Sequence, residues 1–378
     1  MSGEVAFCDL RAAYLARAST TEAALLRVAR SGRYVLGIEV ESFEAELAAV
    51  CGTPHAVGVG SGTDAIALAL RAGGVGAGDE VIVPAYTAAA TWTAVVQAGA
   101  RPVGVDTDPA SGLIDPEAAA AAVGRRTAAL VPVHLFGRLA PMSALRRVAD
   151  RYHLLLVVDA AHAAGVAGED GCAAALADAA AFSFYPTKTL GGLGDGGAVV
   201  TANEDLAGAV RRLRSYGWAD WQGQIPAPGI NSRLDELQAA VLRERLRELP
   251  SIHARLRELG ARYRGALRGC RDLSLPAAPP GAEPPWHQFA VAHPDRDALR
   301  HALAQRGVGT ALHYAPIPPQ LDAFGQTGRF PKAESLASRT LSLPFDPWLT
   351  AAQAGVVCDA VVASSGSCER SRTRSSGS

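Results

Sequence analysis

The sequence predicts an α/β fold: a mostly parallel, mixed sheet sandwiched by helices, with a smaller α+β domain toward the C-terminus. Between residues 55 and 200, short apolar runs alternate with helix-like segments, a rhythm typical of βαβ units. Glycines and polar residues cluster where several of these runs end, at the edge where open α/β sheets bind ligands. The 378 residues, 49% of them hydrophobic, are enough for one large domain and a smaller one.

The elements are expected in the following order. Residues 1–50 have a mostly helical pattern, which is clearest over Glu41–Ala49. The expected strands are Ala56–Val59, Val81–Pro84, Pro102–Val105, Ala128–Val133, Leu154–Val158, Ala179–Phe184 and Ala198–Thr201. The helix-like segments between them include Asp64–Arg71, Pro116–Val123 and Pro141–Tyr152.

The second half of the chain contains an Arg- and Leu-rich helical stretch, Leu234–Leu267, expected to break at Pro250 and to connect two domains. We therefore expect a large domain over residues 1–245 and a small C-terminal domain over 246–363. Residues 275–286 are rich in proline and are predicted to form a loop. Residues 364–378 are a Ser/Gly/Arg tail without an apolar face, for which the composition predicts disorder.

Composition argues against several classes of protein. The net charge of −1 gives no reason to expect nucleic acid or an anionic membrane as a partner. No apolar run reaches the ~18 residues needed to span a bilayer, and the N-terminus lacks the basic start of a signal peptide. The six cysteines form no CxxC pair and the nine histidines show no metal-ligand spacing. We expect reduced thiols in a cytoplasmic enzyme, and no catalytic metal.

Lysine usage is the most informative feature of the composition. Only Lys188 and Lys332 are lysines among the 36 Lys and Arg residues. Lys188 lies in the most glycine-rich stretch of the chain, residues 183–197. A guanidinium stays protonated and cannot form an imine, so a lysine at this place suggests amine chemistry with pyridoxal phosphate (PLP). The alternative is a surface lysine without a chemical role.

Two further segments offer groups that PLP chemistry uses. Ser61-Gly-Thr-Asp64 follows an expected strand and opens a helix, where free N–H groups bind phosphate, although a helix cap by Ser61 or Thr63 fits equally well. Asp159 ends an apolar run 29 residues before Lys188, so one intervening strand would let both face one pocket. Its carboxylate would pair with the cofactor's pyridine nitrogen or cap a helix. His162 either contacts the phenolic oxygen of PLP or is a core or capping histidine.

Seven motifs follow one another in an order that is typical of one family. They are Gly58-Val-Gly-Ser-Gly-Thr-Asp-Ala65, Gly78-Asp-Glu-Val-Ile-Val-Pro-Ala-Tyr-Thr87, Val133-His-Leu-Phe-Gly137, Asp159-Ala-Ala-His162, Phe182-Ser-Phe-Tyr-Pro-Thr-Lys188, Gly229-Ile-Asn-Ser-Arg-Leu-Asp-Glu-Leu-Gln-Ala239 and His313-Tyr314. With these motifs the chain resembles the DegT-like sugar aminotransferases, which are fold-type-I PLP-dependent transferases. The resemblance runs from about residue 40 to residue 361.

The resemblance implies a role for each matching residue. Lys188 would bind PLP covalently, Asp159 would pair with the pyridine nitrogen, and His162 would lie near the cofactor's O3′. The phosphate would be bound by Gly62, Thr63 and Ser183. The resemblance also implies a homodimer with shared active sites, in which Asn231 would reach the partner's cofactor. The substrate pocket would be lined by Tyr185, His313 and Tyr314.

Two residues depart from the family pattern. The family usually places an aromatic ring, stacked on PLP, where this chain has Ala88. Tyr86 or Trp92 would be the candidates to replace that ring. The second departure is Thr189, where asparagine often follows the lysine.

The resemblance implies transfer of an amino group from glutamate or glutamine to a keto sugar, in amino-sugar or natural-product (antibiotic) biosynthesis. Tyr185, the segment Leu193-Gly-Asp-Gly-Gly197 and Tyr216-Gly-Trp218 look more like family members that aminate C3 of a nucleotide-linked 6-deoxyhexose than those that aminate C4. The alternatives are a 4-keto sugar or ketocyclitol as acceptor, a PLP-dependent sugar dehydratase, and a non-catalytic relative. Relatives of the dehydratase type lack the lysine, so Lys188 argues against that alternative.

Overall fold

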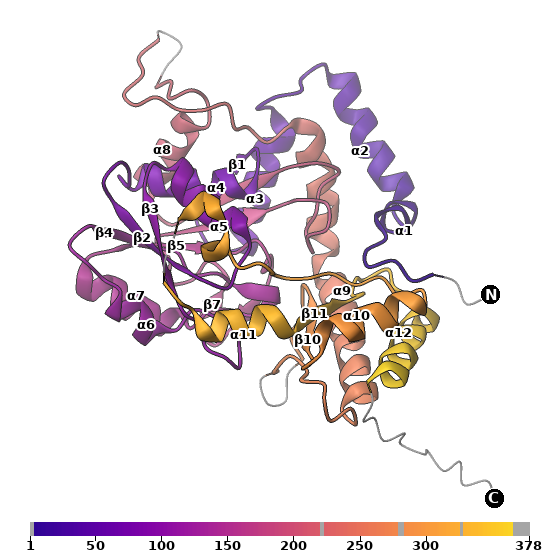
Figure 1. The fold of residues 1–378 in the computed structure, drawn as a ribbon. Coiled ribbons are helices and arrows are strands. Elements are labelled where there is room, and N and C mark those ends of the chain that lie inside the picture. Colours follow the sequence, from indigo (N-terminus) through magenta and orange to yellow (C-terminus); the bar gives the residue numbers. More distant parts are fainter. Residues whose placement is uncertain (1–3, 220–222, 279–282, 326–327, 366–378) are drawn as a thin grey trace, which may run out of the picture.

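The computed structural model describes residues 4–219, 223–278, 283–325 and 328–365. Its centre is a seven-stranded sheet in the order β1-β9-β8-β5-β4-β2-β3 (Figure 1). The strands are β1 His55–Val59, β2 Glu80–Pro84, β3 Arg101–Val105, β4 Thr127–Leu130, β5 Leu155–Asp159, β8 Ala179–Ser183 and β9 Gly197–Thr201. Only β9 runs antiparallel to its two neighbours, β1 and β8; the other pairs are parallel. The predicted mostly parallel, mixed sheet is confirmed.

Helices cover both faces of this sheet. One face is covered by α4 (Gly62–Ala72), α5 (Ala89–Gln97) and α8 (Glu204–Leu213). The other is covered by α3 (Ile38–Val50), α6 (Pro116–Ala121), α7 (Met142–Tyr152) and the first half of α9 (Glu236–Leu267). Neighbouring residues of one strand pack on opposite faces of the sheet: Ala181 lies in the core with α4, α5 and α8, and Phe182 lies in the core with α3, α7 and α9. Because both faces are buried, the strands read as continuous apolar runs rather than alternating ones.

Two elements differ from the sequence-based expectation. The run Ala128–Val133 is strand only to Leu130, although Val133 still forms a bridge to Asp159. Helix α9 is continuous over 32 residues with Pro250 inside it, so the expected break at Pro250 is wrong. Pro250 lies on the exposed side of the helix, while Leu249 and Ile252 beside it are buried. Packing on both sides of the proline thus offsets the hydrogen bond that its missing N–H removes.

A second, smaller core lies beyond the sheet. The strands β10 (Phe289–Ala292) and β11 (Thr340–Leu343) pair antiparallel, and α10 (Arg296–Gln305) and α12 (Ala351–Ser364) pack in the same core. Helix α11 (Pro331–Arg339) packs instead in a separate cluster with Tyr86 and Phe136. Helix α9 contributes to the sheet's core as far as Leu249 and to the smaller core from Ile252 onward. The N-terminal Val5 also packs in the smaller core and bridges to Val308. Our proposed division at residues 245 and 246 falls within this continuous helix.

Three remaining expectations concern the N-terminus, the C-terminus and the cysteines. The N-terminal region is helical, with α1 over Leu10–Leu15 and α2 over Ala18–Ser31. Helix α12 extends through Ser364, the first residue of the expected tail, and residues 366–378 lie outside the described residues.

Four described cysteines are free thiols (Cys8, Cys51, Cys172 and Cys358), whereas Cys270 is disulfide-bonded, so the expectation of reduced thiols is wrong for Cys270. Among the described helices, none is long and apolar enough to cross a membrane.

Candidate active site

The predicted phosphate loop lies where β1 ends and α4 begins. Ser61 accepts a hydrogen bond from the Asp64 N–H at 3.0 Å and caps the helix. A Cβ added to Gly62 would lie 2.5 Å from the Ser183 Cβ, so these two residues, 121 positions apart in sequence, are in direct contact. Glycine is needed there because a larger residue would displace the Ser183 side chain. The start of an 11-residue helix and a serine hydroxyl thus meet at one place, which suits an anion.

A serine that the sequence analysis did not identify holds the predicted phosphate loop through two hydrogen bonds. Ser232 is buried; its hydroxyl accepts from the Gly60 N–H at 2.9 Å and donates to Asp64 at 2.7 Å. The preceding residue, Asn231, is exposed and forms a β-bridge with Ser215. Asn231 is therefore anchored next to the loop while its own side chain is on the surface of the chain.

Asp159 is a buried carboxylate at the end of β5. Its Oδ2 accepts from the Thr91 hydroxyl at 2.7 Å and its Oδ1 from the Ala161 N–H at 3.1 Å. Burial raises the pKa of Asp159, while these two bonds and nearby Lys188 oppose the rise. A turn rather than a helix follows Asp159, so the helix N-cap interpretation is wrong. Thr91 was not anticipated, because nothing in the sequence of α5 indicates which residue faces β5.

Lys188 lies in the loop after β8, and its N–H donates to the Tyr185 carbonyl at 2.8 Å. The residue is half-buried, and burial lowers the pKa of its amine to about 8, while the charge of Asp159 opposes this shift. A substantial fraction of the amine is therefore neutral near physiological pH. A neutral amine is the form that reacts as a nucleophile or accepts a proton.

A cluster of three histidines adjoins the lysine. The rings of His162 and His287 lie 4.3 Å apart, and His162 stacks on Phe136 with an angle of 10° between planes. Burial lowers the pKa of His162 and His287 well below the usual value and that of His313 to about 4. All three are therefore neutral at physiological pH, which avoids repulsion with a charged Lys188.

The predicted His313 and Tyr314 both reach this cluster. His313 Nδ1 lies 2.9 Å from the Ser342 hydroxyl, and the Tyr314 hydroxyl lies 3.5 Å from His162 Nε2. His287 was missed because it directly follows the proline-rich segment predicted as a loop. Its neighbour Trp286, which is fully buried, was the available signal that the chain enters the core there.

The remaining predicted residues lie differently. Tyr185 is 52% exposed, so its place in a substrate pocket stays a prediction. Ala88 is half-buried and is the N-cap residue of α5. Trp92 donates to the Pro84 carbonyl at 3.0 Å and packs on Phe324, and Tyr86 donates to the His313 carbonyl. Both rings are thus engaged elsewhere, and the structure does not support either as a replacement for the aromatic ring missing at Ala88.

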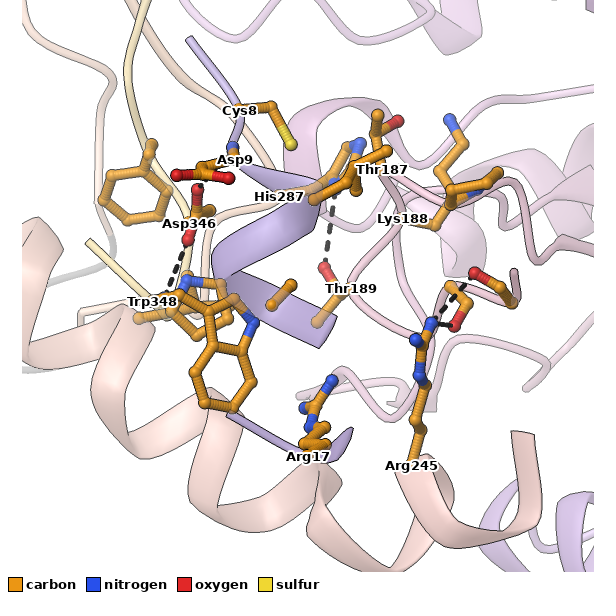
Figure 2. Close-up of a pocket in the computed structure, with 18 of the residues that line it drawn as sticks. Cys8, Asp9, Arg17, Thr187, Lys188, Thr189, Arg245, His287, Asp346 and Trp348 are labelled. Atoms are coloured by element: carbon orange, nitrogen blue, oxygen red, sulfur yellow. Dashed lines mark hydrogen bonds between the residues drawn. The ribbon is translucent and has the colours of Figure 1, made fainter. Parts of the chain in front are cut away.

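A cavity of about 250 Å³ adjoins the lysine loop (Figure 2). Lys188, Thr189 and His287 line one part of it, and the Thr189 hydroxyl lies 3.4 Å from His287 Nδ1. Arg17 and Arg245 line another part. Within the described residues no group of three or more His, Cys, Asp or Glu side chains is arranged to hold a metal ion.

The chain is similar to known proteins along nearly its whole length. Residues 16–362 match the model of the DegT/DnrJ/EryC1/StrS aminotransferase family. A dTDP-3-amino-3,4,6-trideoxy-alpha-D-glucose transaminase from Streptomyces venezuelae is 49% identical over 94% of this chain and 95% of the relative. The crystal structure of S. venezuelae DesV is 46% identical, covers 97% of this chain and 100% of its own, and superposes with a TM-score of 0.93. NtdA from Bacillus subtilis with bound cofactor PMP is 28% identical over 96% of this chain and 85% of its own, with a TM-score of 0.89.

Proposed function

The chain belongs to the DegT/DnrJ/EryC1/StrS aminotransferase family, and from that premise we propose that it transfers an amino group from glutamate or glutamine to a nucleotide-linked keto sugar with PLP as cofactor. One observation carries this proposal. Lys188, the only lysine of residues 1–245, has a lowered pKa, lies within the electrostatic reach of the buried Asp159 carboxylate, and closely follows Ser183, which contacts the start of α4. PLP needs a group of each of these three kinds.

The residues present fit this cofactor. When bound, PLP supplies an aldehyde that takes up an amine and a ring that accepts electrons. Lys188 would bind it covalently, and Gly62, Thr63 and Ser183 would hold its phosphate at the start of α4. The two bonds from Thr91 and Ala161 orient Asp159 and leave lone pairs for a protonated pyridine nitrogen. A cation there would also relieve the desolvation that raises the pKa of Asp159.

Among the chain's own groups, Lys188 would move the protons, and the histidines would position the reacting molecules. Lys188, with a pKa of about 8, can accept a proton from the donor's α-carbon and return it elsewhere as an acid. His162 would lie near the cofactor's phenolic oxygen; its Nδ1 accepts from the Phe136 N–H at 3.3 Å, which fixes the orientation of the ring. Since His162, His287 and His313 are neutral, they position groups by shape and hydrogen bonding rather than by charge.

We propose a 3-keto-6-deoxyhexose as the acceptor. The residues around Tyr185 and Leu193 support it, as does the similarity to the dTDP-3-amino-3,4,6-trideoxy-alpha-D-glucose transaminase of S. venezuelae. A 4-keto sugar or a ketocyclitol is the alternative acceptor; the absence of the family's stacking aromatic at Ala88 would suit an unusual acceptor such as a ketocyclitol. The intact lysine disfavours a dehydratase. Lys188, Asp159 and Ser183 together disfavour a non-catalytic relative.

We further propose a homodimer in which Asn231 of one chain reaches the partner's site. Asn231 is exposed in the single chain yet anchored through Ser232 to the phosphate loop, and twofold dimers are the commonest oligomers. A cytoplasmic location stays a prediction from the sequence.

The acceptor is tested with a panel of keto sugars. A 3-keto and a 4-keto nucleotide-linked 6-deoxyhexose are supplied at equal concentration with glutamate, and the products are identified by mass spectrometry. We expect the 3-keto compound to be aminated faster. Preference for the 4-keto compound, or turnover of a ketocyclitol alone, would overturn the C3 assignment and leave the aminotransferase intact.

A further inference from the structure

Two buried arginines line the cavity beside the lysine loop. Arg17 immediately precedes α2 and Arg245 belongs to α9. The Arg17 side chain is 9% exposed and Arg245 is 8% exposed. The Arg17 Nη2 and the Arg245 Nε are both buried and have no hydrogen-bond partner in the structure. Buried guanidinium N–H groups without an acceptor are costly, so an anionic group in the cavity that both side chains line would stabilise the pair.

The charges around the pair are also unbalanced. Arg17 forms an ion pair with Glu248 at 2.6 Å, whereas Arg245 donates to the uncharged carbonyls of Gly191 and Gly192. One carboxylate thus serves two guanidinium groups. Burial and, secondly, the charge of Arg17 lower the pKa of Arg245 to about 10. A buried positive charge without a counter-charge is strongly unfavourable, and an anionic ligand would supply one.

Two acidic residues of the cavity do not fill this role. Asp9 accepts from the Ala12 N–H at 2.9 Å, and Asp346 accepts from the Trp348 N–H at 2.7 Å. In the described part of the chain, no ion pair joins either carboxylate to Arg17 or Arg245. Their negative charge makes a multiply charged phosphate or diphosphate a poor occupant. A single carboxylate matches the fork of a guanidinium and leaves the two acids undisturbed.

The two arginines lie close to the loop that carries Lys188. Arg245 bonds directly to the loop that follows Lys188, and Lys188 and His287 line the same cavity. Figure 2 shows the Lys188 amine turned away from the two guanidinium groups. A molecule held by the arginines would therefore have its anionic end remote from the reacting amine. The Trp348 ring, 4.2 Å from the Arg17 guanidinium, closes one side of the cavity.

From this geometry we propose that Arg17 and Arg245 bind a carboxylate of the amino donor. The proposal rests on the aminotransferase function proposed above and assigns the donor half of the reaction to this cavity. A carboxylate that is not part of the donor would satisfy the same chemistry, so the test distinguishes the two sources.

The test uses glutarate, a dicarboxylate without an amine, on the PLP-loaded enzyme. Its affinity is measured by calorimetry, and its effect on the glutamate half-reaction is followed by the loss of the cofactor's visible absorption. We expect glutarate to compete with glutamate. In Arg17→Met we expect the glutarate Kd and the glutamate KM each to rise about 10- to 100-fold, as for loss of a charge-assisted bond, with the rate of the keto-sugar half-reaction unchanged.

Two variants control for structural effects. Arg247→Met removes a half-exposed guanidinium that belongs to the same helix as Arg245, pairs with Glu244 and does not line the cavity, and should leave both constants unchanged. Arg17→Lys should restore part of the affinity, because it returns the charge without the fork. Arg245 is not replaced, since it supports the lysine loop.

The outcomes separate this inference from the proposed function. Unchanged glutarate and glutamate constants in Arg17→Met, or glutarate binding that does not compete with glutamate, would overturn the donor assignment while the aminotransferase stands. A wild-type enzyme that never responds to glutamate would instead overturn the proposed function. If Arg17→Met does not fold, competition in the wild type and the Arg17→Lys constants decide the matter.

Discussion

Replacing Asp159 by asparagine isolates the charge of one buried carboxylate. Its two bonds, from Thr91 at 2.7 Å and from the Ala161 N–H at 3.1 Å, can both survive the change. The asparagine carbonyl accepts from Ala161, and its amide donates to the Thr91 hydroxyl, which can turn toward Thr87 at 3.2 Å. The fold should therefore be kept, and because burial already raises the pKa of Asp159, removing its charge should not weaken the sheet.

The expected loss is chemical. Asparagine cannot balance a protonated pyridine nitrogen, so the cofactor's ring should lose transition-state stabilisation of roughly 4 kcal/mol, on the order of 10³-fold in rate. The assay is the stopped-flow rate at which glutamate removes the cofactor's visible absorption, with thermal unfolding measured in parallel. Asp108→Asn is the matched control, because that carboxylate likewise accepts backbone N–H bonds but lies in a turn away from the cavity. A rate loss below about tenfold with unchanged Tm would refute the assignment of Asp159 to the pyridine nitrogen.

Three other predictions follow from the same site. Lys188→Ala should fold but lose borohydride-trappable PLP and turnover, while Lys332→Ala stays near normal; transamination by Lys188→Ala at the wild-type rate would contradict the central assignment. The rate at which added PLP bonds covalently to the cofactor-free protein should rise as pH increases through about 8, because only the neutral Lys188 amine reacts; a flat profile from pH 6 to 9 would contradict it. Mixing inactive Lys188→Ala and Asn231→Ala chains should restore one working site per heterodimer, and no recovery despite proven subunit exchange would place the whole site within one chain.

Local sequence determined much of the fold. The apolar runs predicted the bounds of six strands to within one residue, because strands buried on both faces leave an unbroken apolar signal. These strands are β1, β2, β3, β5, β8 and β9. The start of α4 was also readable, since Ser61 and the glycine after it mark a helix cap. The break at Pro250 was wrong because local propensity cannot register the packing of Leu249 and Ile252 on two different cores.

The sequence by itself indicated the family of this protein and its candidate site: one lysine in a glycine-rich loop, an aspartate at a strand end, and the order of the motifs. Only the tertiary structure decided which residues support them. The Thr91 hydroxyl donates to Asp159 from 68 positions away, the Ser232 hydroxyl accepts from Gly60 in the predicted phosphate loop from 172 positions away, and His287 lies against His162. Arg17, just before α2, and Arg245, in α9, line one cavity in the same way, although they lie far apart in the chain. A side chain's partner depends on which elements pack side by side, and that packing leaves no periodic or local signal in the residues that meet.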